Sequence, residues 1–212
     1  MTESKWDFDG GLLPLDFANT AEWHASPEPL EKLGSYSDLV DWSRSAGVLT
    51  AEEALALEQH AQAHPAEAQL ILTQAIAIRE TIYRIFSSLA DRQAPSTIEL
   101  TKLNHALAEA MSHLQVTKGE SGFDYTWGAE GADLSRPLWP ILQSAAELLT
   151  SEDLNRVGEC ADNRGCGYLF YDTSRNHSRR WCSMESCGNR AKARRHYQRS
   201  KDQFEPDSPT NG

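Results

Sequence analysis

Apolar residues recur at every third or fourth position through most of the first 150 residues, which is the spacing of one face of an amphipathic α-helix. The longest such stretch follows Pro65, a residue type that favours the first turn of a helix. Thr50 with Glu53, and Ser96 with Glu99, have the spacing of a capping box, which marks a helix start. The pattern predicts helices over residues 37–47, 50–57, 65–89, 96–114 and 135–149.

The spacing changes to strict alternation in one stretch of this helical region, as is typical of β-strands with one apolar face. Leu114 and Val116 precede a glycine-containing turn, and Phe123, Tyr125 and Trp127 follow it. We therefore predict a small β-hairpin, and we expect its aromatic side chains to pack on the core.

Residues 10–20, with the sequence GGLLPLDFANT, combine a glycine turn signal with an apolar run of strand length. This pattern predicts a strand or an extended segment in the core. For Asp16 and Asn19 the favoured interpretation is hydrogen bonding of the side chain to nearby backbone. The alternative is a ligand pocket in which these two polar side chains lie with Trp23 and Trp127.

All four cysteines lie in two pairs near the C-terminus, Cys160 with Cys166 and Cys182 with Cys187. Two short loops that each supply two thiolates, separated by a hairpin-sized spacer, are typical of a four-cysteine zinc site. Glycines beside the cysteines allow the tight turns that such loops need. We therefore expect these residues to bind Zn²⁺; disulfides and free buried thiols are the alternatives.

The spacer between the cysteine pairs has an aromatic strand signal at residues 168–171, a polar turn at 172–177 and a second strand signal at 179–181. A helix is expected to start at Cys187. Knuckle, hairpin and helix in this order give a treble-clef-like arrangement. A unit this short cannot bury enough apolar surface to fold alone, so zinc would supply part of its folding free energy.

The elements together predict an α+β fold with an uneven distribution of charge. We expect a mainly helical N-terminal domain with a small β-hairpin over residues 1–153, a treble-clef-like zinc finger over 154–201, and a disordered tail over 202–212. The chain has a net charge of −11, but residues 156–201 hold nine arginines and two lysines against four acidic residues, a net charge of +7 that leaves −18 for the remainder. This segregation favours a phosphate-containing partner for the finger; the alternative is that the basic part docks on the acidic part.

A helix over residues 188–201 would have two basic stripes when its side chains are placed at 100° per residue. One stripe consists of Arg190, Arg194 and Lys201, and the other consists of Lys192, Arg195 and Arg199. The narrow strip between the two stripes contains Ala191 and Gln198. Ala193 and Tyr197 are expected to pack against the finger. Gln198 is the candidate for reading a base through its amide; the alternative is wholly electrostatic binding. The expected nucleic-acid-binding set also includes three hairpin residues, Arg175, Arg179 and Arg180.

Residues 179–192, RRWCSMESCGNRAK, resemble the CGNR zinc-finger family, whose name is the tetrapeptide at 187–190. The hairpin resembles the family at Phe170, Asp172, Ser174, Arg175 and Asn176. In that family the finger follows a domain called ABATE, a putative stress-induced transcription regulator, and residues 15–20 with Asp38, Leu39 and Trp42 resemble its opening. The first cysteine pair has five intervening residues where the family has four, so we expect a bulge near Arg164.

The resemblance and the basic finger together predict a DNA-binding transcriptional regulator whose N-terminal domain is an effector or dimerisation module. A small-molecule-sensing regulator and an RNA-binding protein are the alternatives. Expected partners are DNA, a small-molecule effector and a second copy of the chain. An enzyme is not expected, because the sequence shows no nucleophile–base pair, no glycine-rich phosphate loop and no metal triad with an open position.

The first eleven residues contain acidic side chains where a secretory signal needs a positive end and then an apolar run. No apolar stretch approaches the ~20 residues that span a bilayer. We therefore expect a cytoplasmic protein without a membrane partner. A reducing compartment also favours thiolates on a metal over disulfides.

Overall fold

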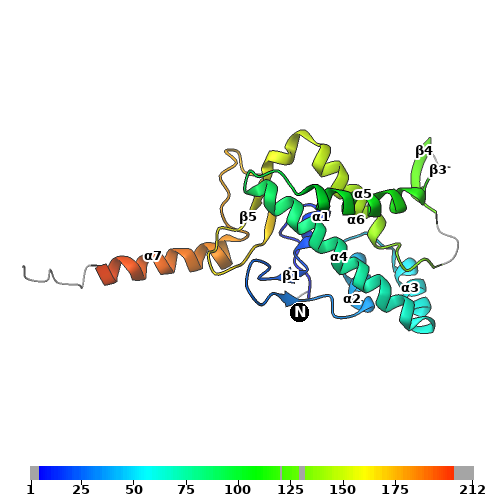
Figure 1. The fold of residues 1–212 in the computed structure, drawn as a ribbon, viewed down its shortest axis with the longest axis horizontal. Coiled ribbons are helices and arrows are strands. Elements are labelled where there is room, and N and C mark those ends of the chain that lie inside the picture. The colour runs from blue at the N-terminus through cyan, green and yellow to red at the C-terminus, as the bar shows by residue number, and fades with distance from the viewer. Residues whose placement is uncertain (1–4, 120, 129–131, 203–212) are drawn as a thin grey trace, which may run out of the picture.

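The computed structural model describes residues 5–119, 121–128 and 132–202, and the side chains of these residues up to position 200. The described part is mainly helical, with small antiparallel strand pairs, as the sequence predicts. Figure 1 shows a helical body from which one helix projects at one end and a hairpin at the other. The tail expected beyond residue 202 lies outside the described residues.

In the part of the chain that the structure describes, six α-helices build the body, and the longest of them lies at its centre. The helices are α1 (Leu13–Ala18), α2 (Tyr36–Ser45), α3 (Ala51–Ala63), α4 (Pro65–Ala90), α5 (Thr97–Ser112) and α6 (Leu138–Thr150), and the projecting helix is α7 (Asn189–Asp202). Helix α4 packs against α1, α2, α3 and α5, while α6 packs against α1 and α5. The core between them contains large side chains that are almost fully buried: Phe17, Trp42, Ile82, Phe86, Trp139 and Ile141.

The described residues also form three antiparallel strand pairs around these helices. They are β1 (Ala21–Glu22) with β2 (Leu30–Glu31), β3 (Leu114–Lys118) with β4 (Phe123–Trp127), and β5 (Val157–Glu159) with β6 (Leu169–Tyr171). The first pair is short, the second is the projecting hairpin, and the third joins the cysteine-containing region to the body.

Capping residues place two of the helix starts close to the predicted positions. Thr50 and Glu53 form both hydrogen bonds of a capping box at the start of α3. At α5, Ser96 caps the helix by accepting from the amide of Ile98, but the predicted second box is wrong. Its carboxylate, on Glu99, binds Arg84 at 3.1 Å and does not reach back to the cap.

The strand predicted within residues 10–20 is wrong, because Leu13–Ala18 forms α1. Pro14 lies in the first turn of this helix, where a missing N–H costs nothing. The carboxylate of Asp16 accepts from the amide of Gly10 at 2.8 Å, which holds the preceding turn against the helix. An apolar run of this length is compatible with a buried strand or a buried helix, and here burial on several sides favours the helix.

The predicted hairpin is confirmed, but the predicted packing of its aromatic side chains is wrong. Leu114 pairs with Trp127, and Val116 pairs with Tyr125, so the alternate residues share one face. Only the base of this face lies against the body, where Trp127 contacts Trp139. Toward the tip, Phe123 is 78% exposed and Tyr125 is 73% exposed, because the hairpin projects beyond the helices.

The cysteine-containing region is attached to the body through β5 and β6. The predicted return strand at residues 179–181 is wrong, because β6 pairs with β5. Val157 and Leu169, one from each strand, are buried in the main core. The side chain of Asn19 in the body accepts from the amide of Leu169 at 2.9 Å and donates to its carbonyl at 2.8 Å. The finger is therefore not an independent unit, and burial against α1 and α4 contributes to its stability.

Candidate functional site

The four cysteine side chains are buried and point toward one centre. Their Sγ atoms lie within 4.8 Å of one another. Cys182 and Cys187 are 3.5 Å apart, Cys187 and Cys166 are 3.7 Å apart, and Cys166 and Cys182 are 3.8 Å apart. A tetrahedral zinc ion with Zn–S bonds of about 2.3 Å requires sulfur atoms about 3.8 Å apart. The donor set and its spacing therefore fit one Zn²⁺, and the four cysteines are positioned to bind one metal ion.

Backbone hydrogen bonds bring the two cysteine loops together. Cys160 follows β5, and its amide donates to the carbonyl of Tyr168 at 2.9 Å across the first loop. Cys187 lies in a π-helical turn, Met184–Gly188, that continues directly into α7. The amide of Ala161 donates to the carbonyl of Arg180, which joins the first loop to the segment that contains Cys182.

Two glycines let the first loop approach the body closely. Gly165 has a φ of +91° and forms a turn in which the amide of Arg164 donates to the carboxylate of Asp162, at the place where an extra residue predicts a bulge. Gly167 has a φ of +64°, and a Cβ atom there would lie 2.6 Å from the hydroxyl of Tyr83 on α4. Glycine is therefore required by the backbone conformation at both positions and by the close contact with α4 at the second.

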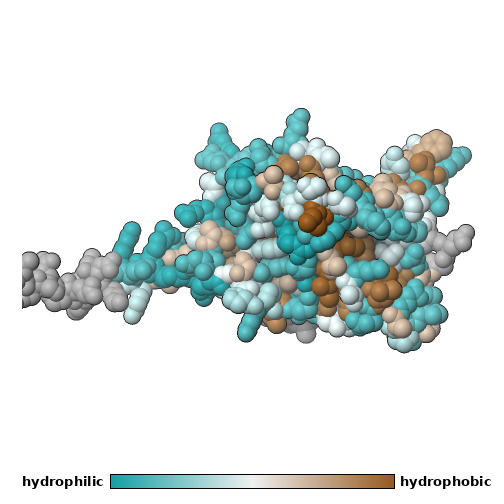
Figure 2. Space-filling view, in the orientation of Figure 1, coloured by the Kyte–Doolittle hydropathy of each residue, from teal (hydrophilic) through white to brown (hydrophobic). Residues whose placement is uncertain are grey.

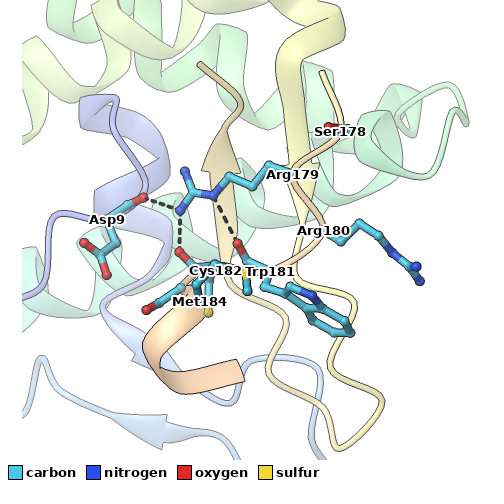
Figure 3. A pocket seen from close by; sticks show the side chains of 8 residues that line it. Asp9, Ser178, Arg179, Arg180, Trp181, Cys182 and Met184 are labelled. Atoms are coloured by element: carbon cyan, nitrogen blue, oxygen red, sulfur yellow. Dashed lines mark hydrogen bonds between the residues drawn. The ribbon is translucent and has the colours of Figure 1, made fainter. Parts of the chain in front are cut away.

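Arg179 holds the second cysteine loop in place. Its guanidinium donates to the carbonyls of Trp181 at 3.1 Å, Tyr171 at 3.3 Å and Asp9 at 3.3 Å, and also to the carbonyl of Cys182, as Figure 3 shows in part. These acceptors occupy the donors of a side chain that the sequence analysis places at the nucleic-acid surface. The neighbouring Arg180 points away from them into solvent.

Asp162 organises the contact between the first loop and α7. Its carboxylate accepts from Arg164 at 2.9 Å and Arg194 at 3.4 Å, and lies 3.6 Å from Nε of Arg190. The hydrogen bond from Arg164 holds the pKa of this carboxyl well below its usual range. Arg190 also donates to Sγ of Cys187 at 2.8 Å, which would stabilise a thiolate there.

The face of α7 that meets the finger differs from the predicted face. Arg190 and Arg194 lie against the finger through Asp162, whereas Tyr197 is 73% exposed and Ala193 is also exposed. The prediction that Ala193 and Tyr197 pack on the finger is wrong. The buried carboxylate of Asp162 instead attracts Arg190 and Arg194 and places their side of α7 against the finger.

The remaining basic side chains extend into solvent on the finger and on α7. The exposed set consists of Arg175, Arg180, Lys192, Arg195 and Arg199. Gln198 lines a hollow of about 270 Å³ together with Ala191, Arg180 and Arg195. The side chain of Lys201, the last predicted member, lies outside the described residues.

The four residues of the predicted ligand pocket lie at three separate places. Asp16 and Asn19 are neighbours in the body, where their side chains bind backbone groups of Gly10 and Leu169. Trp23 packs on the cysteine cluster, with the guanidinium of Arg190 5.3 Å from its ring centroid. Trp127 contacts Trp139 beneath the hairpin. The structure therefore does not bring these four side chains around one pocket.

Asp162 and Trp23 are the site residues whose structural roles the sequence analysis missed. An Asp two positions after a cysteine is also a normal turn residue, so its type gives no sign of three arginine partners. Trp23 lies 137 positions before Cys160 in the sequence and reaches the finger only because the loop after α1 runs beside it. One sequence signal does point to Asp162. The last residue of the CGNR signature, Arg190, needs an acidic partner when it lies against the finger, and that partner is Asp162.

Asp16→Asn is expected to stabilise the chain at pH 8 but not at pH 4. Burial raises the pKa of Asp16 to about 7, so the folded state favours the protonated carboxyl. Ionising it lowers the free energy of unfolding as the pH rises from about 4 to 7, and a neutral amide would avoid a loss of roughly 2–4 kcal/mol. Urea unfolding at both pH values would measure this, with Asp124→Asn as an exposed control. Equal stabilities of variant and wild type at pH 8 would contradict the assignment.

Comparison with known protein families gives two matches. Residues 11–152 match ABATE, described as a putative stress-induced transcription regulator, and residues 156–200 match the CGNR zinc finger. Neither is an enzyme family. No curated protein matches the chain. Among the described residues, no helix has the length and apolar character needed to cross a membrane.

Proposed function

Since the chain belongs to the ABATE family of putative stress-induced transcription regulators and carries a CGNR zinc finger, we propose that it regulates transcription by binding DNA through α7. The finger, residues 154–201, is the DNA-binding unit, and residues 1–153 form the effector or dimerisation unit. A reducing compartment such as the cytoplasm would keep the four thiols available for zinc.

The observation that carries this proposal is the exposure of basic residues on a helix that projects from the body. Lys192, Arg195 and Arg199 form one stripe of α7 and have solvent-exposed side chains. Figure 1 shows α7 extending away from the helical body, and Figure 2 shows that its surface is mostly hydrophilic. The alternative in which the basic part docks on the acidic part has little support from this arrangement.

Zinc and Asp162 have complementary roles in presenting α7. Zn²⁺ held by the four thiolates would fix the turn that contains Cys187 and, through it, the start of the helix. Asp162 binds Arg190 and Arg194, so these two arginines orient α7 and are not free to bind phosphate. The opposite stripe then meets the nucleic acid.

The geometry supports binding of α7 in the major groove. An α-helix fits that groove, and cationic side chains along it contact phosphates on the groove walls. Gln198 is exposed and lines the same hollow as Arg180 and Arg195, a position from which its amide could reach an adenine edge. Arg175 and Arg180, on the finger itself, would add phosphate contacts beside the helix.

A gel-shift titration of the zinc-loaded chain with duplex DNA tests this function. The proposal expects a complex that disappears when a chelator removes zinc and returns when zinc is restored. Single-stranded RNA of the same length serves as the competing ligand. Preferential binding of RNA, or absence of any DNA complex, would contradict DNA binding by the finger.

A further inference from the structure

The β3–β4 hairpin exposes an apolar face that the transcription-regulator proposal does not use. Val116 is 63% exposed, and Phe123 and Tyr125 are more exposed still. Cross-strand pairing places these three side chains on the same face as Trp127 at the base. Soluble proteins rarely present a row of large apolar side chains on a projecting element unless another surface covers them. Figure 2 shows hydrophobic residues on this projection.

A groove in the body begins where this face ends. It has a volume of about 520 Å³ and lies between α4, α5 and the start of α6. Its apolar walls include Ile71, Ile78, Leu138 and Trp139. Trp139 is almost fully buried and also contacts Trp127, so the base of the hairpin lies beside one end of the groove. A second hollow of about 400 Å³ extends the groove along α4 and α5, and both are lined by Ile78 and Leu142.

We propose that two copies of the chain form a symmetric dimer in which the hairpin of each copy lies in the groove of the other. The hairpin face and the groove lie next to each other on one chain, so two copies can each place a hairpin in the groove of the other. A two-fold axis near Trp127 and Trp139 would place each hairpin over the partner's groove, so the interface closes on itself and adds no third copy.

Charge and area both favour a second copy as the occupant. Lys118 pairs with Phe123 and lies on the apolar face, while Glu109 and His105 line the groove. A lysine at the hairpin tip would therefore meet an acidic residue of the partner. An aromatic side chain buries about 150–250 Å², so the three exposed side chains of one hairpin would bury roughly 400 Å². With both hairpins and both grooves included, the dimer would bury roughly 1,600 Å², the size of a standard stable interface.

This dimer would leave both zinc fingers free. Figure 1 shows the hairpin and α7 at opposite ends of the molecule. Association through the hairpin end would place the two α7 helices at the far ends of the dimer, where each could bind a separate DNA segment. Dimerisation and DNA binding are thus independent and can fail separately.

Molar mass measured by light scattering during gel filtration tests the dimer. The wild-type chain is expected to have twice the 23.6 kDa mass of one copy at micromolar concentration. The double variant Phe123→Ser/Tyr125→Ser is expected to be monomeric, with an affinity reduced at least about 100-fold. Thr117→Ser/Thr126→Ser, which changes exposed residues on the opposite face of the same hairpin, is the matched control and should remain dimeric.

A variant of the groove distinguishes hairpin-in-groove binding from hairpin-to-hairpin binding. Ala77→Arg changes an exposed groove residue and should also give monomers, whereas Gln69→Arg, which is exposed on α4 but does not line the groove, should not. Mixing the hairpin variant with Ala77→Arg restores one intact contact and should produce a weak heterodimer. A monomeric wild type or a dimeric hairpin variant would overturn the proposal.

Discussion

Removal of zinc is expected to lower the unfolding temperature of the whole chain by at least about 10 °C. The effect should destabilise the helical body as well as the finger. Binding of a structural zinc ion contributes many kcal/mol to folding, and for a chain of this size each kcal/mol corresponds to about 2–4 °C. The finger shares core residues Val157 and Leu169 with the body, and Asn19 joins the two through paired hydrogen bonds. The loss of zinc should therefore lower the stability of both the finger and the body.

Thermal unfolding followed by circular dichroism, with and without a chelator, measures this effect. Re-addition of zinc is the control for irreversible damage, and Cys182→Ser should reproduce the chelated state without a chelator. Asn19→Ala is expected to weaken the connection, so that chelation lowers the main transition less than in the wild type. An unfolding temperature that does not respond to chelation would show that the four thiols do not stabilise the fold through a metal.

Neutralising the exposed stripe of α7 is expected to weaken duplex-DNA binding roughly 100-fold near physiological salt. The variant Lys192→Gln/Arg195→Gln/Arg199→Gln removes three cations whose side chains extend into solvent. Each phosphate contact contributes about 0.9 to the slope of log affinity against log salt, so three lost contacts should reduce both the affinity and the slope. Fluorescence anisotropy with a labelled duplex measures both quantities.

A control variant with the same change in charge separates local contacts from net charge. Lys5→Gln/Arg44→Gln/Arg92→Gln removes three exposed cations from the body, outside both the finger and the groove. It should leave DNA affinity within about threefold of the wild type, because long-range effects of surface charge are screened by salt. Equal losses in the two variants would refute a specific role for α7.

The metal centre could be predicted from the sequence because its chemistry is local. Four cysteines in two closely spaced pairs specify the ligands, and the glycines beside Cys166 specify the turn. The helices were also predictable, since apolar spacing and the capping pair Thr50–Glu53 are local signals. Both features depend on neighbouring residues in the sequence and little on contacts with distant parts of the chain.

The orientation of α7 and the pairing of β6 could not be predicted, because distant residues decide both. Asp162 turns Arg190 toward the finger, although the helix sequence alone favours Ala193 and Tyr197 on that side. Strand β6 pairs with β5, which precedes the first cysteine, and the nearer segment at 179–181 forms no strand. The exposure of Phe123 and Tyr125 could not be predicted either. Alternating apolar residues identify one face of a strand, but they do not show whether another element covers that face.

The salt dependence of duplex-DNA affinity, measured on the zinc-loaded wild-type chain, decides whether the finger binds DNA. Apart from the arginines that bind Asp162, the described finger and α7 present five exposed cations, Arg175, Arg180, Lys192, Arg195 and Arg199. Log affinity is expected to fall linearly with log salt, with a slope of about −4.5. A slope near zero, or no measurable affinity at low salt, would contradict a DNA-binding role for the finger.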